Sequence, residues 1–142
     1  MENKKEFGQI MAAELEICRT VRLVKTTEQE IQTVERPLRE IYEWMSRIEE
    51  NRNEELYRAL GEFIREVGEE ITLIAEVKKL ETETSLDIFD RRDKVRELTR
   101  KLQEQVETID KTLDKVKEQL DDDKPLVEVM YKSIVLEEEK GS

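Results

Sequence analysis

The chain has 142 residues, a formal net charge of -11 at pH 7, 37% hydrophobic residues and 43% charged residues. This length fits one domain, and such a high charged fraction beside a moderate apolar fraction is typical of helices that bury one stripe and expose the rest. The negative charge argues against non-specific binding to nucleic acid or to anionic membranes, because both would repel the chain.

The sequence offers little to a catalytic or metal site, because it has no histidine and a single cysteine. Histidine is the commonest general base and metal ligand, and one cysteine can form neither an intrachain disulfide nor a cysteine-based zinc site. Glycine-rich phosphate loops and nucleophile elbows are also missing from the sequence. We therefore expect a non-enzymatic protein with no catalytic residue, cofactor or metal.

The single cysteine, Cys18, lies between Ile17 and Val21 in an apolar helical pattern, so we expect it in the core. A lone cysteine fits a reducing compartment. No signal-peptide pattern follows Met1, and no stretch approaches the ~18 apolar residues of a membrane span. These features predict a cytoplasmic protein. The richness in charged and branched residues also fits a thermophilic source, a hypothesis that an unfolding midpoint below about 60 °C would contradict.

The most regular pattern is an apolar residue at every seventh position between residues 10 and 45. Its members are Ile10, Ile17, Val24, Ile31, Leu38 and Met45, and a second row adds Val34, Ile41 and Ile48. A period near 3.5 residues predicts a helix with a coiled-coil seam. The phase continues through Thr26 and Thr27, where a capping box with Glu30 could restart a helix, and through Pro37. We expect one long helix with a kink at the proline.

A second helix is predicted over residues 54–82, after residues 51–53, where asparagine is a strong N-cap. Its apolar face is wide enough to touch two neighbours, so we expect this helix to be the most buried. Gly61 and Gly68 lie on the flank of that face, and each costs roughly 1 kcal/mol of helix stability against alanine. A close approach of another helix at both glycines would offset this cost.

A turn over residues 82–87 leads to a third predicted helix over residues 88–121, which Thr84, Ser85 and Asp87 are all able to cap. The predicted fold is all-α: an elongated bundle of three to four long antiparallel helices with coiled-coil-like packing, over residues 1–124. Residues 125–142 are expected to form a short C-terminal helix or strand and an acidic tail.

Three arginines, Arg92, Arg96 and Arg100, recur at every fourth position and so stack along one line of the third predicted helix. Such a line could contact phosphates or another anionic partner. Asp93 and Glu97 interleave with it, and no aromatic residue alternates with it to stack on bases. The competing interpretation, which we favour, is a solvated flank with intramolecular ion pairs.

Three aromatic residues, Tyr42, Trp44 and Tyr57, lie at the end of the first predicted helix and the start of the second. Aromatic residues at such a place could anchor a partner helix. They also simply pack the ends of bundles, with the polar atom at the surface, and we favour this second interpretation.

Three carboxylates, Glu66, Glu69 and Glu70, lie close together on the second predicted helix. Buried paired carboxylates can hold a metal or perform acid–base chemistry, but helical di-iron sites need a histidine that this chain does not have. Because glutamate is seldom buried without a partner, we expect a solvated helix face here.

Together these features predict a protein–protein interaction, scaffold or assembly module that acts through its helix faces, with charge complementarity selecting its partners. The outer seams could also pair two chains in a homodimer. The alternative is a nucleic-acid-associated protein, which either contacts phosphates through the arginine line or mimics nucleic acid by its acidity.

Overall fold

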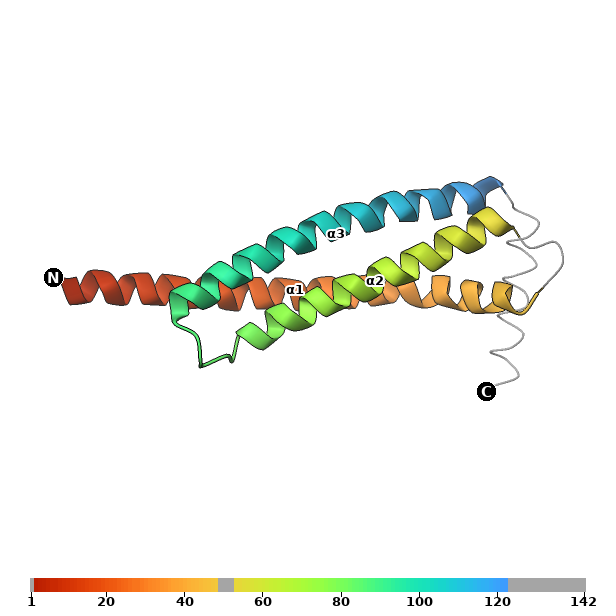
Figure 1. Ribbon diagram of the computed structural model, residues 1–142. Helices are drawn as coiled ribbons and strands as arrows, with labels where there is room; N and C mark the ends of the chain where they lie inside the picture. The colour runs from red at the N-terminus through yellow and green to blue at the C-terminus, as the bar shows by residue number, and fades with distance from the viewer. Residues whose placement is uncertain (1, 49–52, 123–142) are drawn as a thin grey trace. The chain divides into compact units, whose positions relative to one another are not determined.

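The computed structural model describes residues 2–48 and 53–122. They form three helices and, within these ranges, no strand: α1 (Glu2–Ser46), α2 (Glu54–Leu80) and α3 (Ile88–Asp122) (Figure 1). The helices pack against one another, which confirms the predicted all-α bundle. The predicted C-terminal element over residues 125–142 lies outside the described residues.

The first helix continues through both positions where the sequence allows a break. The hydroxyls of Thr26 and Thr27 donate to the carbonyls of Arg22 and Leu23 at 3.2 and 3.1 Å, so they bond back into the helix instead of capping a new one. Pro37 lies inside α1 as well. The predicted single helix is therefore confirmed.

The starts of α2 and α3 are fixed by the side chains that the sequence places there. Asn53 Oδ1 accepts a hydrogen bond from the amide of Leu56 at 3.1 Å, and Asp87 Oδ2 accepts one from the amide of Phe89 at 3.2 Å. Each side chain satisfies an amide that has no partner within its own helix. Asn53 and Asp87 are thus the capping residues among the candidates that the sequence offers, and α2 ends at Leu80, two residues before the expected end.

The three helices contribute to two compact units. The first unit comprises Met1–Ile31 and Gly68–Val106, and the second comprises Gln32–Val67 and Glu107–Ser142. Each unit therefore contains one segment of every helix, with its own hydrophobic core.

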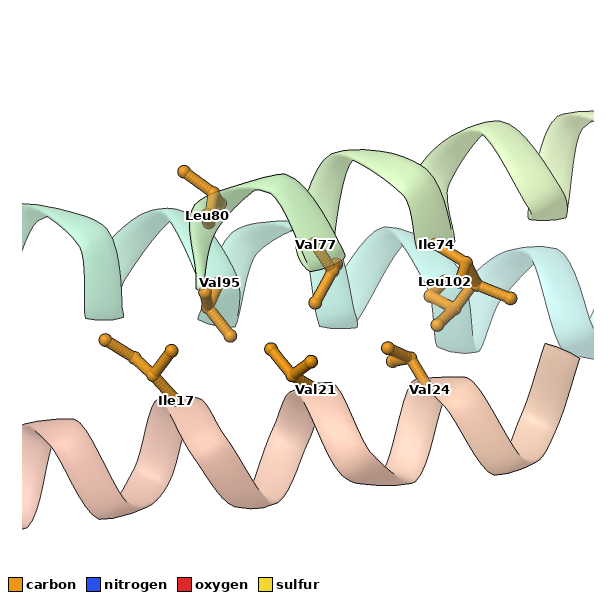
Figure 2. Close-up of a cluster of buried hydrophobic side chains, with 8 residues drawn as sticks. All are labelled: Ile17, Val21, Val24, Ile74, Val77, Leu80, Val95 and Leu102. Atoms are coloured by element: carbon orange, nitrogen blue, oxygen red, sulfur yellow. The ribbon is translucent and has the colours of Figure 1, made fainter. Parts of the chain in front are cut away.

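The core of the first unit is aliphatic, and Figure 2 shows side chains of α1 directed toward those of α2 and α3. Its buried members are Ile17, Val21, Val24, Ile74, Val77, Leu80, Val95 and Leu102. Lys25 pairs with Glu81 and Glu28 with Lys78, so α1 and α2 run antiparallel in this unit. The seam residues Ile17 and Val24 lie in this core, as the sevenfold spacing predicts.

The core of the second unit combines aliphatic residues with aromatic rings. Its buried members are Met45, Leu56, Ala59, Leu60 and Val116, and the partly buried residues packed on them are Leu38, Ile41, Tyr42, Trp44, Tyr57 and Leu120. Although α2 is the shortest helix, it contributes more buried hydrophobic residues than either α1 or α3. This confirms that α2 is the most buried element.

The two glycines of α2 differ from each other. A Cβ atom at Gly61 would lie 3.4 Å from Tyr42 Cε2, so the ring of an α1 side chain packs directly on this glycine. A Cβ atom at Gly68 would meet no atom within 4 Å, and the residue is exposed. The predicted close approach is confirmed at Gly61 and wrong at Gly68.

The prediction that Cys18 lies in the core is also wrong, because its side chain is exposed. Ile17 and Val21 are both buried. A residue that follows Ile17 is turned by about 100° around the helix, which carries Cys18 off the buried face.

Candidate interaction surface

The first turns of α1 project past the turn that joins α2 and α3 in the first unit (Figure 1). Residues 4–9 are all exposed, and the first buried side chain of the helix is that of Ala13. This part of α1 therefore lacks a covering helix among the described residues of its unit, although its sequence is not purely polar.

An exposed apolar row runs along these turns. Phe7, Met11 and Leu15 are 64%, 46% and 50% exposed, and their spacing of four residues places them along one line of the helix. Cys18, three residues after Leu15 and on the same side of the helix, is exposed too. The row lies beside the buried seam that includes Ile17, so α1 has two apolar stripes here, and the described residues cover only the stripe that includes Ile17.

The charged groups around this exposed row are unbalanced. Lys4, Arg19 and Arg22 lie next to the row on the helix surface and are exposed, and within the described part of the chain no ion pair engages them. Of the acidic side chains on the same turns, Glu14 pairs with Arg91 at 2.9 Å and Glu16 with Arg96 at 2.8 Å. Glu6 is exposed, but its position in the sequence places it on the side of the helix away from the row. Although the whole chain is strongly acidic, the row is bordered by free cations.

The arginine line of α3 is engaged by carboxylates of the same chain. Arg92 contacts Asp93 at 3.2 Å, and Arg100 contacts Glu104 at 3.0 Å. Arg96 donates two hydrogen bonds to Glu16, at 2.9 and 2.8 Å, and these bonds raise the pKa of the Arg96 guanidinium. A phosphate would have to displace these carboxylates, so the geometry agrees with the solvated flank.

The three predicted aromatic residues lie together in the second unit. The rings of Tyr42 and Tyr57 are stacked, with centroids 4.7 Å apart and planes within 7° of each other. Both rings and Trp44 are partly buried against the core of that unit. They pack the bundle in cis, and a role as anchors for a partner stays a prediction.

The three carboxylates of α2 do not share one environment. Glu66 and Glu70 are buried, at 5% and 1% exposure, while Glu69 is exposed and accepts a hydrogen bond from Gln105 at 3.1 Å. The buried Thr112 hydroxyl donates to Glu66 Oε1 at 3.0 Å. The expected solvated face is therefore wrong for Glu66 and Glu70. Among the described residues, no group of three or more histidine, cysteine or acidic side chains could hold a metal ion.

Sequence reasoning missed the role of Arg91, which is only 13% exposed. Its Nη1 donates to the carbonyls of Leu80 and Glu81 at 3.3 and 2.9 Å, and its Nη2 donates to Glu14 Oε1 at 2.9 Å. A guanidinium at this place satisfies the carbonyl of the last residue of α2 and that of the residue after it, and it suits the negative end of the helix dipole. Arg91 thereby joins all three helices of the first unit.

An open groove lies between the end of α2 and the start of α3, in the first unit, with a volume of about 430 Å³. Leu80, Leu86 and Leu98 form its apolar lining, and lysines and glutamates alternate around it. One of them, Glu83, accepts hydrogen bonds from the Ser85 hydroxyl and amide at 2.7 and 3.2 Å, which lower the pKa of its carboxyl. The mixture of charges favours no single ligand.

No protein family, curated protein or solved structure matches this chain. Within the described residues, none of the helices combines the length and apolarity that crossing a membrane requires. The candidate surface must therefore be judged by its own geometry and chemistry.

Proposed function

We propose that this protein is a non-enzymatic interaction or assembly module, and that the exposed row Phe7, Met11 and Leu15 on α1 is its partner-binding surface. The observation that carries the proposal is the large exposure of three long apolar side chains on one line of a projecting helix. Single exposed apolar residues are common, whereas an aligned group marks a contact site.

The expected mechanism is helix-on-helix packing. Burying one side chain of this size contributes roughly 1.5–3 kcal/mol, so three of them can drive association once the entropy of binding is offset. The spacing of four residues is the one by which an amphipathic helix contacts a groove or another helix. The stripe that includes Ile17 already packs in cis, which leaves this row for a partner.

Affinity purification from an extract of the source cell tests the proposal. The triple variant Phe7→Gln, Met11→Gln, Leu15→Gln removes the apolar row while keeping side chains that favour helix. Leu23→Gln is the matched control, because Leu23 is 64% exposed on the same helix but lies off the row. We expect proteins that co-purify with the unmodified chain and with Leu23→Gln to be lost from the triple variant.

The proposal is overturned if the triple variant recovers the same proteins as the control. Circular dichroism of both variants should match that of the unmodified chain, because the replaced side chains do not belong to either core. A loss of helix in the triple variant alone would show that the row serves folding rather than binding.

A further inference from the structure

We infer that the exposed row of α1 binds residues 126–139 of a second copy of this chain. The inference rests on the proposed function, since it names the partner of the same surface. A partner of the row needs apolar side chains that can cover Phe7, Met11 and Leu15. It also needs negative charge that can pair with the exposed cations beside them.

The exposed cations beside the row indicate that the partner carries negative charge. Lys4, Arg19 and Arg22 border the row without an ion pair in the described part of the chain, and the nearby acids Glu14 and Glu16 are held by arginines of α3. Two such rows facing each other would bring like charges together, which is unfavourable. The same row of a second copy is therefore a poor partner, and an acidic apolar segment is a good one.

The chain itself contains a segment with this chemistry. Between residues 126 and 139, four glutamates accompany one lysine. The glutamates are Glu128, Glu137, Glu138 and Glu139. The same stretch contains Leu126, Val127, Val129, Met130, Tyr131, Ile134, Val135 and Leu136. Apolar surface and negative charge thus coincide in one segment, as they must for a partner of the row.

Light scattering and sedimentation of the full chain over a wide range of concentration measure its self-association and so test this inference. We expect a concentration-dependent dimer. The row variant Phe7→Gln, Met11→Gln, Leu15→Gln and the tail variant Glu137→Gln, Glu138→Gln, Glu139→Gln should each raise the dissociation constant at least about tenfold. Leu23→Gln and Asp121→Asn are the matched controls and should change it less than about twofold.

Mixing the two variants distinguishes this contact from any symmetric one. The tail variant still has an intact row, and the row variant still has an intact tail, so the mixture can form one productive contact. We expect the mixture to associate more tightly than either variant alone. Raising the salt concentration from about 0.05 to 0.5 M should weaken association of the unmodified chain, because the cations that border the row are exposed.

Several outcomes overturn the inference. A monomer at all concentrations does so, as does a dimer that the row variant weakens and the tail variant leaves unchanged. Binding of the monomer to vesicles of phosphatidylserine and phosphatidylcholine, lost in the row variant, would assign the row to anionic lipid. If the row variant loses co-purifying proteins while the unmodified chain stays monomeric, the inference fails and the proposed function stands with another partner.

Discussion

The two units contain segments of the same three helices, but different side chains hold the helices together. In the first unit an aliphatic core is bordered by ion pairs between helices, which join Glu14 to Arg91, Glu16 to Arg96 and Glu28 to Lys78. In the second unit two tyrosine rings stack beside the core, and Thr112 donates a buried hydrogen bond to Glu66. Ion pairs between helices thus border the core of the first unit, whereas stacked rings border the core of the second.

Because of this difference, added salt should weaken the contacts at the border of the first unit more than those of the second. Exposed ion pairs are screened by salt, whereas stacked rings and buried apolar contacts are not. The exposed apolar row of α1 also belongs to the first unit, the unit whose core is bordered by ion pairs.

The largest effect is expected at Arg91, where one guanidinium joins the three helices of the first unit. Arg91→Met keeps much of the apolar stem but leaves the carbonyls of Leu80 and Glu81 and the carboxylate of Glu14 without their donor. We expect the free energy of unfolding, measured by urea denaturation, to fall by about 2–3 kcal/mol.

The neighbouring Arg92 supplies the control. Its ion pair is with the adjacent Asp93, on the same helix. Arg92→Met should therefore change the free energy of unfolding by less than about 0.5 kcal/mol. Equal effects of the two substitutions would mean that Arg91 does not hold the first unit together.

In the second unit, the stacked tyrosines should couple to each other. Tyr42→Leu, Tyr57→Leu and the double variant form a cycle, from which we expect a coupling energy of about 1 kcal/mol. Urea denaturation at low and high salt measures it, and the coupling should be the same in both. A coupling near zero would show that the rings, although 4.7 Å apart, only fill space.

The helices and their ends could be predicted from the sequence, because their determinants are local. Asn53 and Asp87 cap helices through amides two or three residues away, and the sevenfold seam of α1 needs only its own spacing. The turn between α2 and α3 is predicted over residues 82–87 from local capping residues as well.

The exposed surface could not be predicted in this way. An apolar pattern tells which residues share a helical face, but α1 has two adjacent stripes, and only packing against α2 and α3 decides which is buried. Cys18 was misplaced for this reason. Arg91 was missed because Glu14, its partner, is 77 residues away in the sequence.

One of the missed residues did leave a signal. Glu70 continues the alternating three- and four-residue spacing of the buried face of α2, as the seventh residue after Phe63 and the third after Val67. A charged residue at a core position of this pattern predicts burial, and Glu70 is 1% exposed. For Glu70, the position in the helical pattern is therefore a better guide to burial than the charge of the side chain.

The two glycines of α2 allow a smaller comparison between the units. Gly68→Ala, in the first unit, should raise the free energy of unfolding by about 0.5–1 kcal/mol, because alanine favours the helix and its Cβ meets nothing within 4 Å. Gly61→Ala, in the second unit, should give a different gain, because its Cβ would lie in van der Waals contact with the Tyr42 ring, 3.4 Å from Cε2. Identical gains at both positions would contradict the close packing at Gly61.

The smallest effect is expected at the ion pair of Glu16 and Arg96. Its dependence on salt tests whether the contacts at the border of the first unit are electrostatic. Both side chains are substantially exposed, at 38% and 57%, so a cycle of Glu16→Gln, Arg96→Gln and the double variant should give a coupling of about 0.5 kcal/mol or less. In ~1 M salt, where the screening length is about 3 Å, this coupling should approach zero. Under the same conditions the tyrosine coupling should persist, because stacking does not depend on free charge. If the ion pair keeps its coupling in high salt, the charged border of the first unit is a packed contact, and the contrast between the units loses its electrostatic basis.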